Sequence, residues 1–278
     1  MNRAINKHLS IGQYWDFYYY ECMCSNLCLL FKLLQYTMPI LLIIYMIMLP
    51  QTIFANNTTN RQHIINLSSD GSFKQFSINA NTNDGTISEY HNYSEIKYDS
   101  SKHALIINFE NLQDKFVDDN NYLQNNSSMW NQEVFEIFIA LGQNDPTQYL
   151  EFEINPNNAT FTGWITNKNG KGTDTSIEFF DAKKYGIITT ITKSTDSWRG
   201  HIELPLSIFN LQKTSSFNNH HFRVNFFRVA AKNFHKNIDQ NKWACDTKTC
   251  AYLAWSPTHS GINPAFHITK YFGTLNIQ

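Results

Sequence analysis

Short runs of alternating apolar and polar residues recur from Phe73 onward, and no stretch there keeps a sustained helical period. Such runs, bounded by clusters of Asn, Asp, Gly and Ser, are typical of β-strands separated by turns. About eight or more short strands without helices between them predict an all-β fold, an antiparallel β-sandwich or jelly roll in a single domain. The clearest expected strands are His103–Phe109, Glu133–Leu141, Tyr149–Asn155, Thr160–Thr166, Tyr185–Thr192, Trp198–Leu204, His221–Ala230 and Phe272–Ile277.

The charges nearly cancel. Charged residues make up 16% of the chain, and the formal net charge is -1. A protein that binds nucleic acid through its overall field carries a basic surplus, so we expect no nucleic-acid partner. The sequence has no glycine-rich phosphate loop, and we expect no nucleotide ligand. Aromatic residues reach 15% and supply enough apolar bulk for a packed core.

An apolar segment precedes the domain. Residues 27–49 are almost entirely apolar, and a tripeptide ending on Ala55 follows them. A basic flank, an apolar core and a small terminal residue predict a secretory signal peptide, with Met38 as an alternative true start. The competing interpretation is an uncleaved anchor, since a segment of this length can span a bilayer. We therefore expect a secreted protein or, alternatively, one anchored by a single span with its domain outside. The expected parts are a signal peptide or anchor (1–55), an Asn-rich exposed lead-in (56–72) and the β-sandwich (73–278).

Two cysteines remain after this leader. Cys245 and Cys250 lie in the segment CDTKTC, and in an exported chain such a pair predicts one local disulfide. Sequons in an exported chain predict glycosylation of exposed loops. The sequons chosen as glycosylation sites are Asn57, Asn66, Asn92, Asn126 and Asn158.

The expected strand Tyr149–Asn155 alternates cleanly between two faces. One face, with Leu150, Phe152 and Ile154, is suited to the core, and the other presents two carboxylates and an amide.

Glu136 is the unusual residue of the expected strand Glu133–Leu141, which precedes Tyr149–Asn155. It stands between Phe135 and Ile137 in a stretch otherwise suited to burial. A buried carboxylate needs a partner or a ligand, because an unpaired charge in a dry site is costly. Three alternatives stay open for Glu136: a ligand contact, an edge position, or a core salt bridge to Arg223 or Arg228.

Five ordered segments carry a family resemblance. They are Trp130-Asn-Gln-Glu-Val-Phe-Glu136-Ile-Phe-Ile, Tyr149-Leu-Glu-Phe-Glu153-Ile-Asn155-Pro156, Trp198-Arg-Gly-His-Ile-Glu203-Leu-Pro205, Phe222-Arg223-Val-Asn225-Phe-Phe-Arg228, and a closing group of Ala254-Trp255-Ser-Pro257, Phe266-His267 and Tyr271-Phe-Gly273-Thr-Leu. In this order they resemble a family 9 carbohydrate-binding module and cover nearly all of the domain. The resemblance implies an antiparallel β-sandwich that binds a saccharide without catalysis, in polysaccharide recognition or carbohydrate catabolism.

The resemblance also implies a site. Members of the family hold a sugar between two tryptophans, which would be Trp130 and Trp255 here, while Glu136 matches a sugar-contacting acid and Asn155 a sugar-contacting amide. The departure is Glu153, where a sugar-binding member carries Arg, so that the charge beside the slot is reversed. We expect Trp130→Ala or Trp255→Ala to abolish sugar binding and leave the fold intact.

Such a module requires no cofactor, although calcium ions brace loops in the family. Asp118 and Asp119, in a loop rich in oxygen donors, are the candidate calcium ligands.

Three other function classes compete with carbohydrate binding. A glycoside hydrolase would use paired carboxylates, but no acid lies in a hydrolase motif. A haem-binding sandwich would need Met129 and a facing histidine as ligands. An extracellular adhesion or structural sandwich without a sugar ligand is the main alternative to carbohydrate binding.

Overall fold

The computed structural model of the chain describes residues 63–212, 220–233 and 244–278. These residues all fall within one unit, Gln62–Gln278, as expected for a single domain. The predicted leader and the sequon Asn57 lie outside the described residues. Of the helices in the described ranges, none has the length and apolar character needed to cross a membrane.

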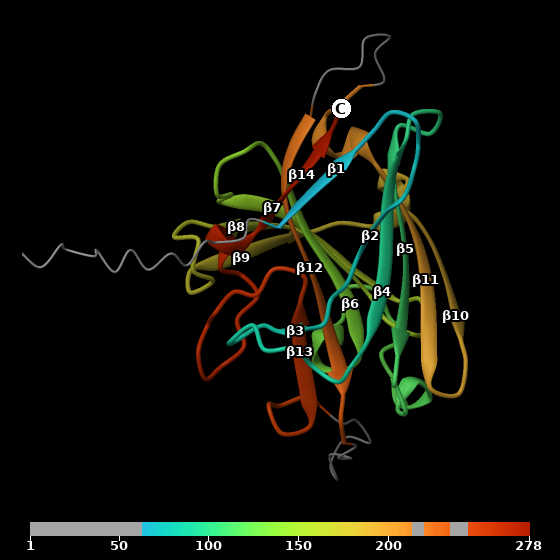
Figure 1. Cartoon of the computed structure of the whole chain (residues 1–278), viewed down its shortest axis with the longest axis vertical. Coiled ribbons are helices and arrows are strands. Elements are labelled where there is room, and N and C mark those ends of the chain that lie inside the picture. The colour runs from blue at the N-terminus through green and yellow to red at the C-terminus, as the bar shows by residue number, and fades with distance from the viewer. Residues whose placement is uncertain (1–62, 213–219, 234–243) are drawn as a thin grey trace, which may run out of the picture. The chain divides into compact units, whose positions relative to one another are not determined.

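Two β-sheets make up the described part of the chain, with only short 3-10 helices between strands (Figure 1). The strands are β1 (Ile64–Leu67), β2 (Lys74–Phe76), β3 (Ala80–Asn81), β4 (Asn92–Asp99), β5 (Ala104–Leu112), β6 (Val134–Leu141), β7 (Gln148–Ile154), β8 (Thr160–Asn167), β9 (Thr175–Phe179), β10 (Ile188–Lys193), β11 (Ser197–Pro205), β12 (His220–Ala231), β13 (Cys250–Ala254) and β14 (Gly273–Ile277). The 3-10 helices are η1 (Val117–Asp119), η2 (Met129–Asn131), η3 (Ala182–Tyr185), η4 (Leu206–Phe209) and η5 (Thr269–Tyr271).

The nine-stranded sheet runs in the order β1-β14-β12-β6-β7-β8-β9, with β13 on β12 and β3 on β13. The five-stranded sheet runs in the order β10-β11-β5-β4-β2, and Figure 1 shows most of its strands side by side. All pairs are antiparallel apart from β1 with β14. The predicted antiparallel β-sandwich is therefore confirmed.

The first strand corrects one predicted boundary. β1 pairs with β14 and buries Ile65 and Leu67, so the stretch 56–72 is not simply an exposed lead-in. A second boundary moves at Tyr185, which ends η3 instead of starting β10. Gly186 follows it with φ 75, a left-handed conformation that stops the helix at low cost.

The main core lies between the two sheets. Alternate residues of β7 point into it, namely Leu150, Phe152 and Ile154 as predicted, and Trp198 of β11 packs there fully buried. The other face of the nine-stranded sheet is also buried, around Phe138, which belongs to a second apolar cluster. Because both faces are covered, β6 is buried at every position except its last.

The segment between β13 and β14 provides much of that second cover. The ring of Phe266 stacks on Phe227 of β12, with centroids 4.2 Å apart and planes at 6°. His267 lies over Phe138, and its Nδ1 is 2.6 Å from the hydroxyl of Tyr149.

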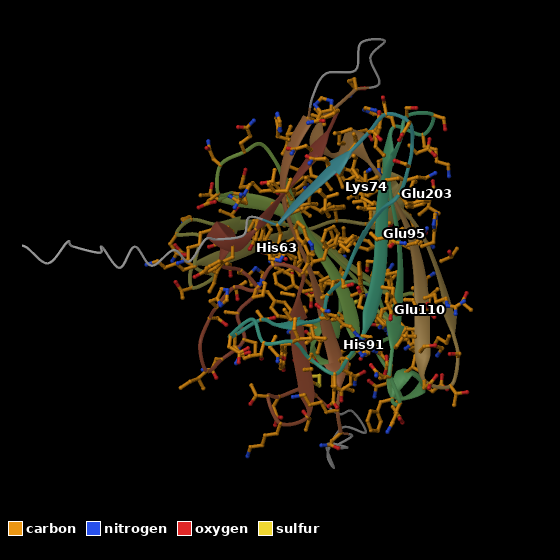
Figure 2. The ribbon with its side chains drawn as sticks, viewed as in Figure 1. His63, Lys74, His91, Glu95, Glu110 and Glu203 are labelled. Carbon is orange, nitrogen blue, oxygen red and sulfur yellow. A yellow bond between two sulfur atoms is a disulfide. The ribbon has the colours of Figure 1, made fainter. Side chains whose placement is uncertain are left out.

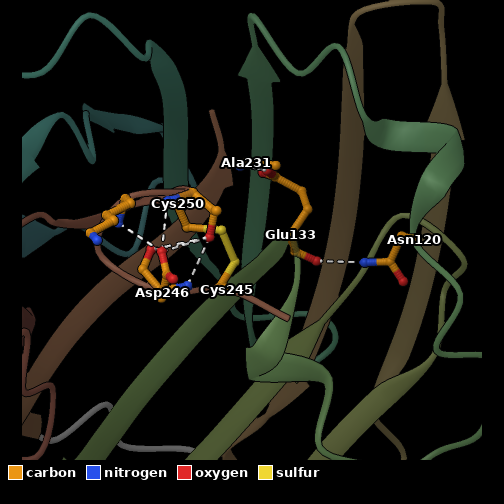
Figure 3. The surroundings of a disulfide bond; sticks show 8 residues. Asn120, Glu133, Ala231, Cys245, Asp246 and Cys250 are labelled. Carbon is orange, nitrogen blue, oxygen red and sulfur yellow. Dashed lines mark hydrogen bonds between the residues drawn. A yellow bond between two sulfur atoms is a disulfide. The ribbon is translucent and has the colours of Figure 1, made fainter. Parts of the chain in front are cut away.

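A fully buried ion pair joins the sheets. Arg228 Nε of β12 donates to Glu133 Oε1 at 3.0 Å, just before β6 begins. Its other nitrogens donate to the carbonyls of His91 and Leu112, at the ends of β4 and β5 in the five-stranded sheet. Glu133 Oε2 accepts from the Ala231 amide, and the Glu133 carbonyl accepts from Asn120 Nδ2, the bond that Figure 3 marks. The open alternative that pairs Arg228 with Glu136 is therefore wrong.

The predicted disulfide is confirmed. Cys245 and Cys250 are bonded, with their Cα atoms 5.3 Å apart, where β13 begins (Figure 3).

The predicted glycosylation sites differ in how exposed they are. Asn66, Asn126 and Asn158 are exposed, Asn66 within strand β1, and their glycosylation stays a prediction. Asn92 is buried, and its side chain bonds to the Ile78 amide and to Asn111. A glycan on the folded protein is excluded there, so the prediction for Asn92 is wrong.

Removal of Glu133 tests the buried ion pair. We expect Glu133→Gln to lower the free energy of unfolding by about 3–5 kcal/mol, because it leaves the Arg228 charge buried without its partner. Arg199→Met is the matched control, since Arg199 pairs with Glu110 at 2.8 Å but is mostly exposed. Arg199→Met should lower the free energy of unfolding by less than about 1 kcal/mol. Urea denaturation of the three proteins measures both values; equal losses would show that the buried pair is not special.

Candidate functional site

The pairing of β6 with β7 gathers three glutamates on one face. Glu136 lies opposite Glu153, and Phe138 lies opposite Glu151. Paired residues of an antiparallel ladder point to the same side, so all three carboxylates lie on the face of the nine-stranded sheet that turns away from the main core.

These three glutamates, called here the glutamate triad, are buried and close together. Their exposed fractions are 1% for Glu136, 6% for Glu151 and 0% for Glu153. One carboxylate oxygen from each lies within 4.8 Å of the others. None of the described residues donates a hydrogen bond to Glu136 Oε1 or to either oxygen of Glu153. The ion pairs formed in the described part of the chain do not include the triad either.

Burial without a countercharge changes the protonation of the triad. Desolvation raises the pKa of Glu136 well above its usual range, and the charge of Glu151 raises it further. Desolvation, followed by repulsion from Glu136 and Glu151, raises the pKa of Glu153 in the same way. Burial also raises the pKa of Glu151, to about 7. The free protein therefore resists carrying three charges here, and a positively charged or hydrogen-bond-donating ligand would relieve this cost.

The triad lines a pocket of about 490 Å³. On the β8 side, Trp130 and Phe161 form its wall, with ring centroids 5.1 Å apart in an edge-to-face contact. On the β12 and β13 side, Tyr252 and Phe266 form the opposite wall. The strand order places β6 and β7, which carry the glutamates, between these walls. The result is a carboxylate-rich site flanked by aromatic rings.

Trp130 is well placed for a ligand. It lies in η2, and 40% of its surface is exposed. The neighbouring Met129 is completely buried in an apolar cluster with Val134 and Phe161.

Asn155 is not in the pocket. Its Nδ2 donates to the Tyr122 carbonyl at 2.8 Å, and its Oδ1 accepts from the amides of Asn157 and Ala159. These bonds fasten the turn after β7 to the preceding loop. The predicted sugar-contacting amide has a structural role instead.

Trp255 is not in the pocket either. It is 8% exposed and packs in the main core, with its ring 5.8 Å from Phe226 and 6.2 Å from Phe76. His63, labelled in Figure 2, meets it edge-on at 5.1 Å. Trp130 and Trp255 therefore do not form two walls of one slot. The structure brings together Trp130, Glu136 and Glu153 from the predicted set, and their contact with a sugar remains a prediction.

Asp118 and Asp119, the predicted calcium ligands, lie in and beside an exposed ion pair. Asp118 is exposed and pairs with Lys193 Nζ at 3.1 Å. Among the residues that the structure describes, the triad is the one group of at least three acidic, histidine or cysteine side chains close enough to share an ion. Calcium binding at Asp118 and Asp119 stays a prediction.

Glu151 and the wall formed by Tyr252 and Phe266 were not predicted from the sequence. Glu151 belongs to the polar face of β7, of which the resemblance singles out only Glu153 and Asn155. Tyr252 and Phe266 carry no local signal, since long-range pairing of β13 with β12 and the fold of the covering segment bring them to the pocket.

A second hollow, of about 760 Å³, lies on the outer face of the five-stranded sheet, where Glu95 and Glu110 are labelled in Figure 2. Its polar groups bond to one another: Asn108 donates to Glu95 at 2.8 Å and contacts His201. A polar face whose groups satisfy one another is typical of a solvated sheet surface. This hollow offers a ligand fewer unpaired hydrogen-bonding groups than the triad does.

A β-sandwich with an aromatic-walled, carboxylate-rich pocket defines a binding module for small polar ligands. The sequence matches the family described as carbohydrate-binding family 9 over residues 80–277. The chain belongs to carbohydrate-binding family 9, and its function is carbohydrate binding.

Several other proteins are similar to this chain. A protein from Arthroderma benhamiae named "Extracellular protein" is 28% identical over 178 residues, which cover 61% of this chain and 71% of the relative. The crystal structure of a Bacteroides uniformis protein described as carbohydrate-binding has a TM-score of 0.50 at 15% identity, covering 75% of this chain and 87% of its own, and shows the same fold. A family 9 module from Caldicellulosiruptor kristjanssonii, solved with cellotriose, has a TM-score of 0.45 at 15% identity over 78% of this chain and 94% of its own.

Trp130 and Trp255 should contribute differently to the stability of the fold. We expect Trp255→Ala to lower the free energy of unfolding by about 3–5 kcal/mol, because it leaves a cavity in the main core. Trp130→Ala should cost no more than about 1 kcal/mol, since much of its ring is exposed. Chemical denaturation of both variants measures this; a larger loss for Trp130→Ala would contradict the burial pattern.

His267 should make stability depend on pH. Burial lowers the pKa of His267 to about 4, from an ordinary value of 6.5. As the pH falls below 6.5, the unfolded chain binds a proton that the folded protein refuses, so the free energy of unfolding falls until the pH nears 4.

Between pH 7 and pH 5 this contribution amounts to about 2 kcal/mol. The measurement is the difference between the parent and His267→Asn, which removes the titration. The variant should lose less stability over this interval, and parallel curves for the two proteins would contradict the assignment.

Proposed function

We propose that the chain is an exported, non-catalytic module that holds a saccharide in the pocket over the glutamate triad. The observation that carries the proposal is an exposed Trp130 beside buried carboxylate oxygens that receive no hydrogen bond from the described residues. Membership of carbohydrate-binding family 9 supplies the ligand class.

The chemistry of a sugar ring matches the two parts of this site. A pyranose has an apolar face of C–H groups, which packs on an aromatic ring such as that of Trp130. Its hydroxyls donate hydrogen bonds, and carboxylates are acceptors. Glu136 and Glu153 would accept from these hydroxyls, and each bond to a charged group contributes about 1.5–3 kcal/mol. Tyr252 and Phe266 would bound the ring on the opposite side.

Two features favour binding without catalysis. The family is one of binding modules. A glycoside hydrolase also needs one carboxyl kept protonated and another kept ionised by contrasting surroundings. Here burial raises the pKa of all three triad members, so none of them has the low pKa that would hold a nucleophile or base ionised.

Export has separate support. The Cys245–Cys250 disulfide is of the kind found in exported proteins, and the Arthroderma benhamiae relative is named as extracellular. The apolar segment before the domain would direct the chain out of the cell as a signal peptide or hold it at the membrane as an anchor.

A binding screen with the full-length protein tests the proposed site. Calorimetry with glucose-, galactose- and mannose-based mono- and disaccharides, and retention on insoluble glucans, identify the sugar. Trp130→Ala should weaken binding of that sugar at least about tenfold, equivalent to about 1.4 kcal/mol of lost stacking. The matched control is Tyr93→Ala, which removes a 60% exposed aromatic side chain from the hollow of the five-stranded sheet.

The outcomes separate the alternatives. Loss of binding in Tyr93→Ala but not in Trp130→Ala would move the site to the five-stranded sheet. Release of reducing sugar during the screen would contradict the non-catalytic role. Retention of a cell-surface protein, with no sugar bound by the folded chain, would favour an adhesion module.

A further inference from the structure

The glutamate triad lacks a countercharge that its surroundings could supply. The two buried arginines on the neighbouring strand β12 point elsewhere: Arg228 binds Glu133, and Arg223 binds Asp145 at 3.1 Å. The alternative salt bridge of Glu136 to Arg223 is therefore also wrong. An isolated buried charge is costly, and three adjacent ones are costlier still, so a missing positive partner is the simplest solution.

The spacing of the carboxylates fits one metal ion. Calcium binds oxygen ligands at about 2.3–2.6 Å, so two oxygens on opposite sides of one ion are about 4.6–5.2 Å apart. The three triad oxygens lie within 4.8 Å of one another. They can therefore all coordinate a single ion with little movement of β6 or β7.

The unpartnered oxygens point to a ligand independently of this spacing. Glu136 Oε1 and both oxygens of Glu153 are buried and accept no hydrogen bond from the described residues. Buried polar atoms are rarely left in this state. A bound cation would satisfy all of these oxygens at once.

We propose that the glutamate triad binds a divalent calcium ion at the bottom of the pocket, and that the saccharide completes its coordination through hydroxyl oxygens. The second part rests on the proposed function, whereas the first does not. Calcium accepts six to eight oxygen ligands in flexible geometry, so three carboxylates leave positions for water or sugar. Zinc prefers nitrogen and sulfur ligands, and magnesium requires a stricter octahedron.

The ion would supply the positive charge that the described surroundings of the triad do not provide. The rival explanation is a triad that stays protonated and shares its protons internally, with no metal bound.

Direct titration decides between the ion and the rival explanation. Calcium chloride is titrated into the full-length protein, previously stripped with EDTA, and calorimetry measures the stoichiometry. We expect one ion per chain with a dissociation constant below about 1 mM, and a thermal midpoint that falls again when EDTA is added. No heat and no midpoint shift with calcium at neutral pH would overturn the proposal.

Isosteric variants locate the ion. Glu153→Gln should weaken calcium binding at least about tenfold, because ligand charge sets the affinity, while the similar shape preserves the packing. Glu95→Gln is the matched control, since Glu95 lies on the outer face of the five-stranded sheet, and it should leave calcium binding unchanged. If Glu153→Gln fails to fold, Glu136→Gln gives the same test. Unchanged calcium affinity in a folded triad variant would place the ion elsewhere and overturn the proposal.

Sugar binding is measured separately, with and without calcium. The expected result is binding that EDTA abolishes and calcium restores. Sugar binding that persists unchanged in EDTA would overturn the coordination of sugar by the ion and leave the proposed function intact. Calcium binding without any sugar binding would contradict the proposed function and leave the metal site standing.

Discussion

The buried pair of Arg228 and Glu133 is the contact on which the geometry of the domain depends. Arg228 extends from β12 to two carbonyls at the ends of strands in the other sheet, while Glu133 stands directly before β6. The pair thereby sets where β6 begins relative to β12. A shift of β6 by one residue would turn every side chain to the opposite face. Glu136 would then enter the main core, and the pocket would lose one of its carboxylates.

The nine-stranded sheet departs from a simple sandwich because its outer face is covered as well. The segment between β13 and β14 lies over Phe138 and Phe227, so the outer face combines a dry apolar area with a partly open pocket. This arrangement keeps carboxylates away from water while leaving them accessible to a ligand. Low local polarity strengthens any interaction that the triad makes with a cation or a hydroxyl group.

Strong local patterns allowed much of the fold to be predicted. The alternation of β7 and the continuous apolar run of β6 identified both strands, and the turn residues between them set their limits. Strands with weaker patterns were missed: β9 is almost wholly exposed, and β13 follows a disulfide loop. Their place depends on pairing with distant strands, which a single sequence does not display.

The site was predictable where its residues lie on one well-patterned strand pair. Glu136 stood out because an acid interrupts an apolar run, and the family resemblance added Trp130. The predicted place of Trp255 in the pocket was wrong because its position beside Ser-Pro resembles a loop end. The tertiary fold instead turns its ring inward against Phe226. The predicted place of Asn155 in the pocket was wrong for a related reason, since its side-chain amide bonds to backbone groups of a buried turn.

The disulfide has a consequence for the width of the pocket. Cys250 begins β13 two residues before Tyr252, and the Cys245 amide donates to the carbonyl of Asn131, next to Trp130. The disulfide loop and this one hydrogen bond thus connect the two opposing aromatic walls. In a reducing environment this brace opens, and the walls are held only by hydrogen bonds and packing. The width of the pocket then depends on the thiol–disulfide balance around the protein. The affinity for a ligand would therefore depend on the redox conditions as well as on the fold.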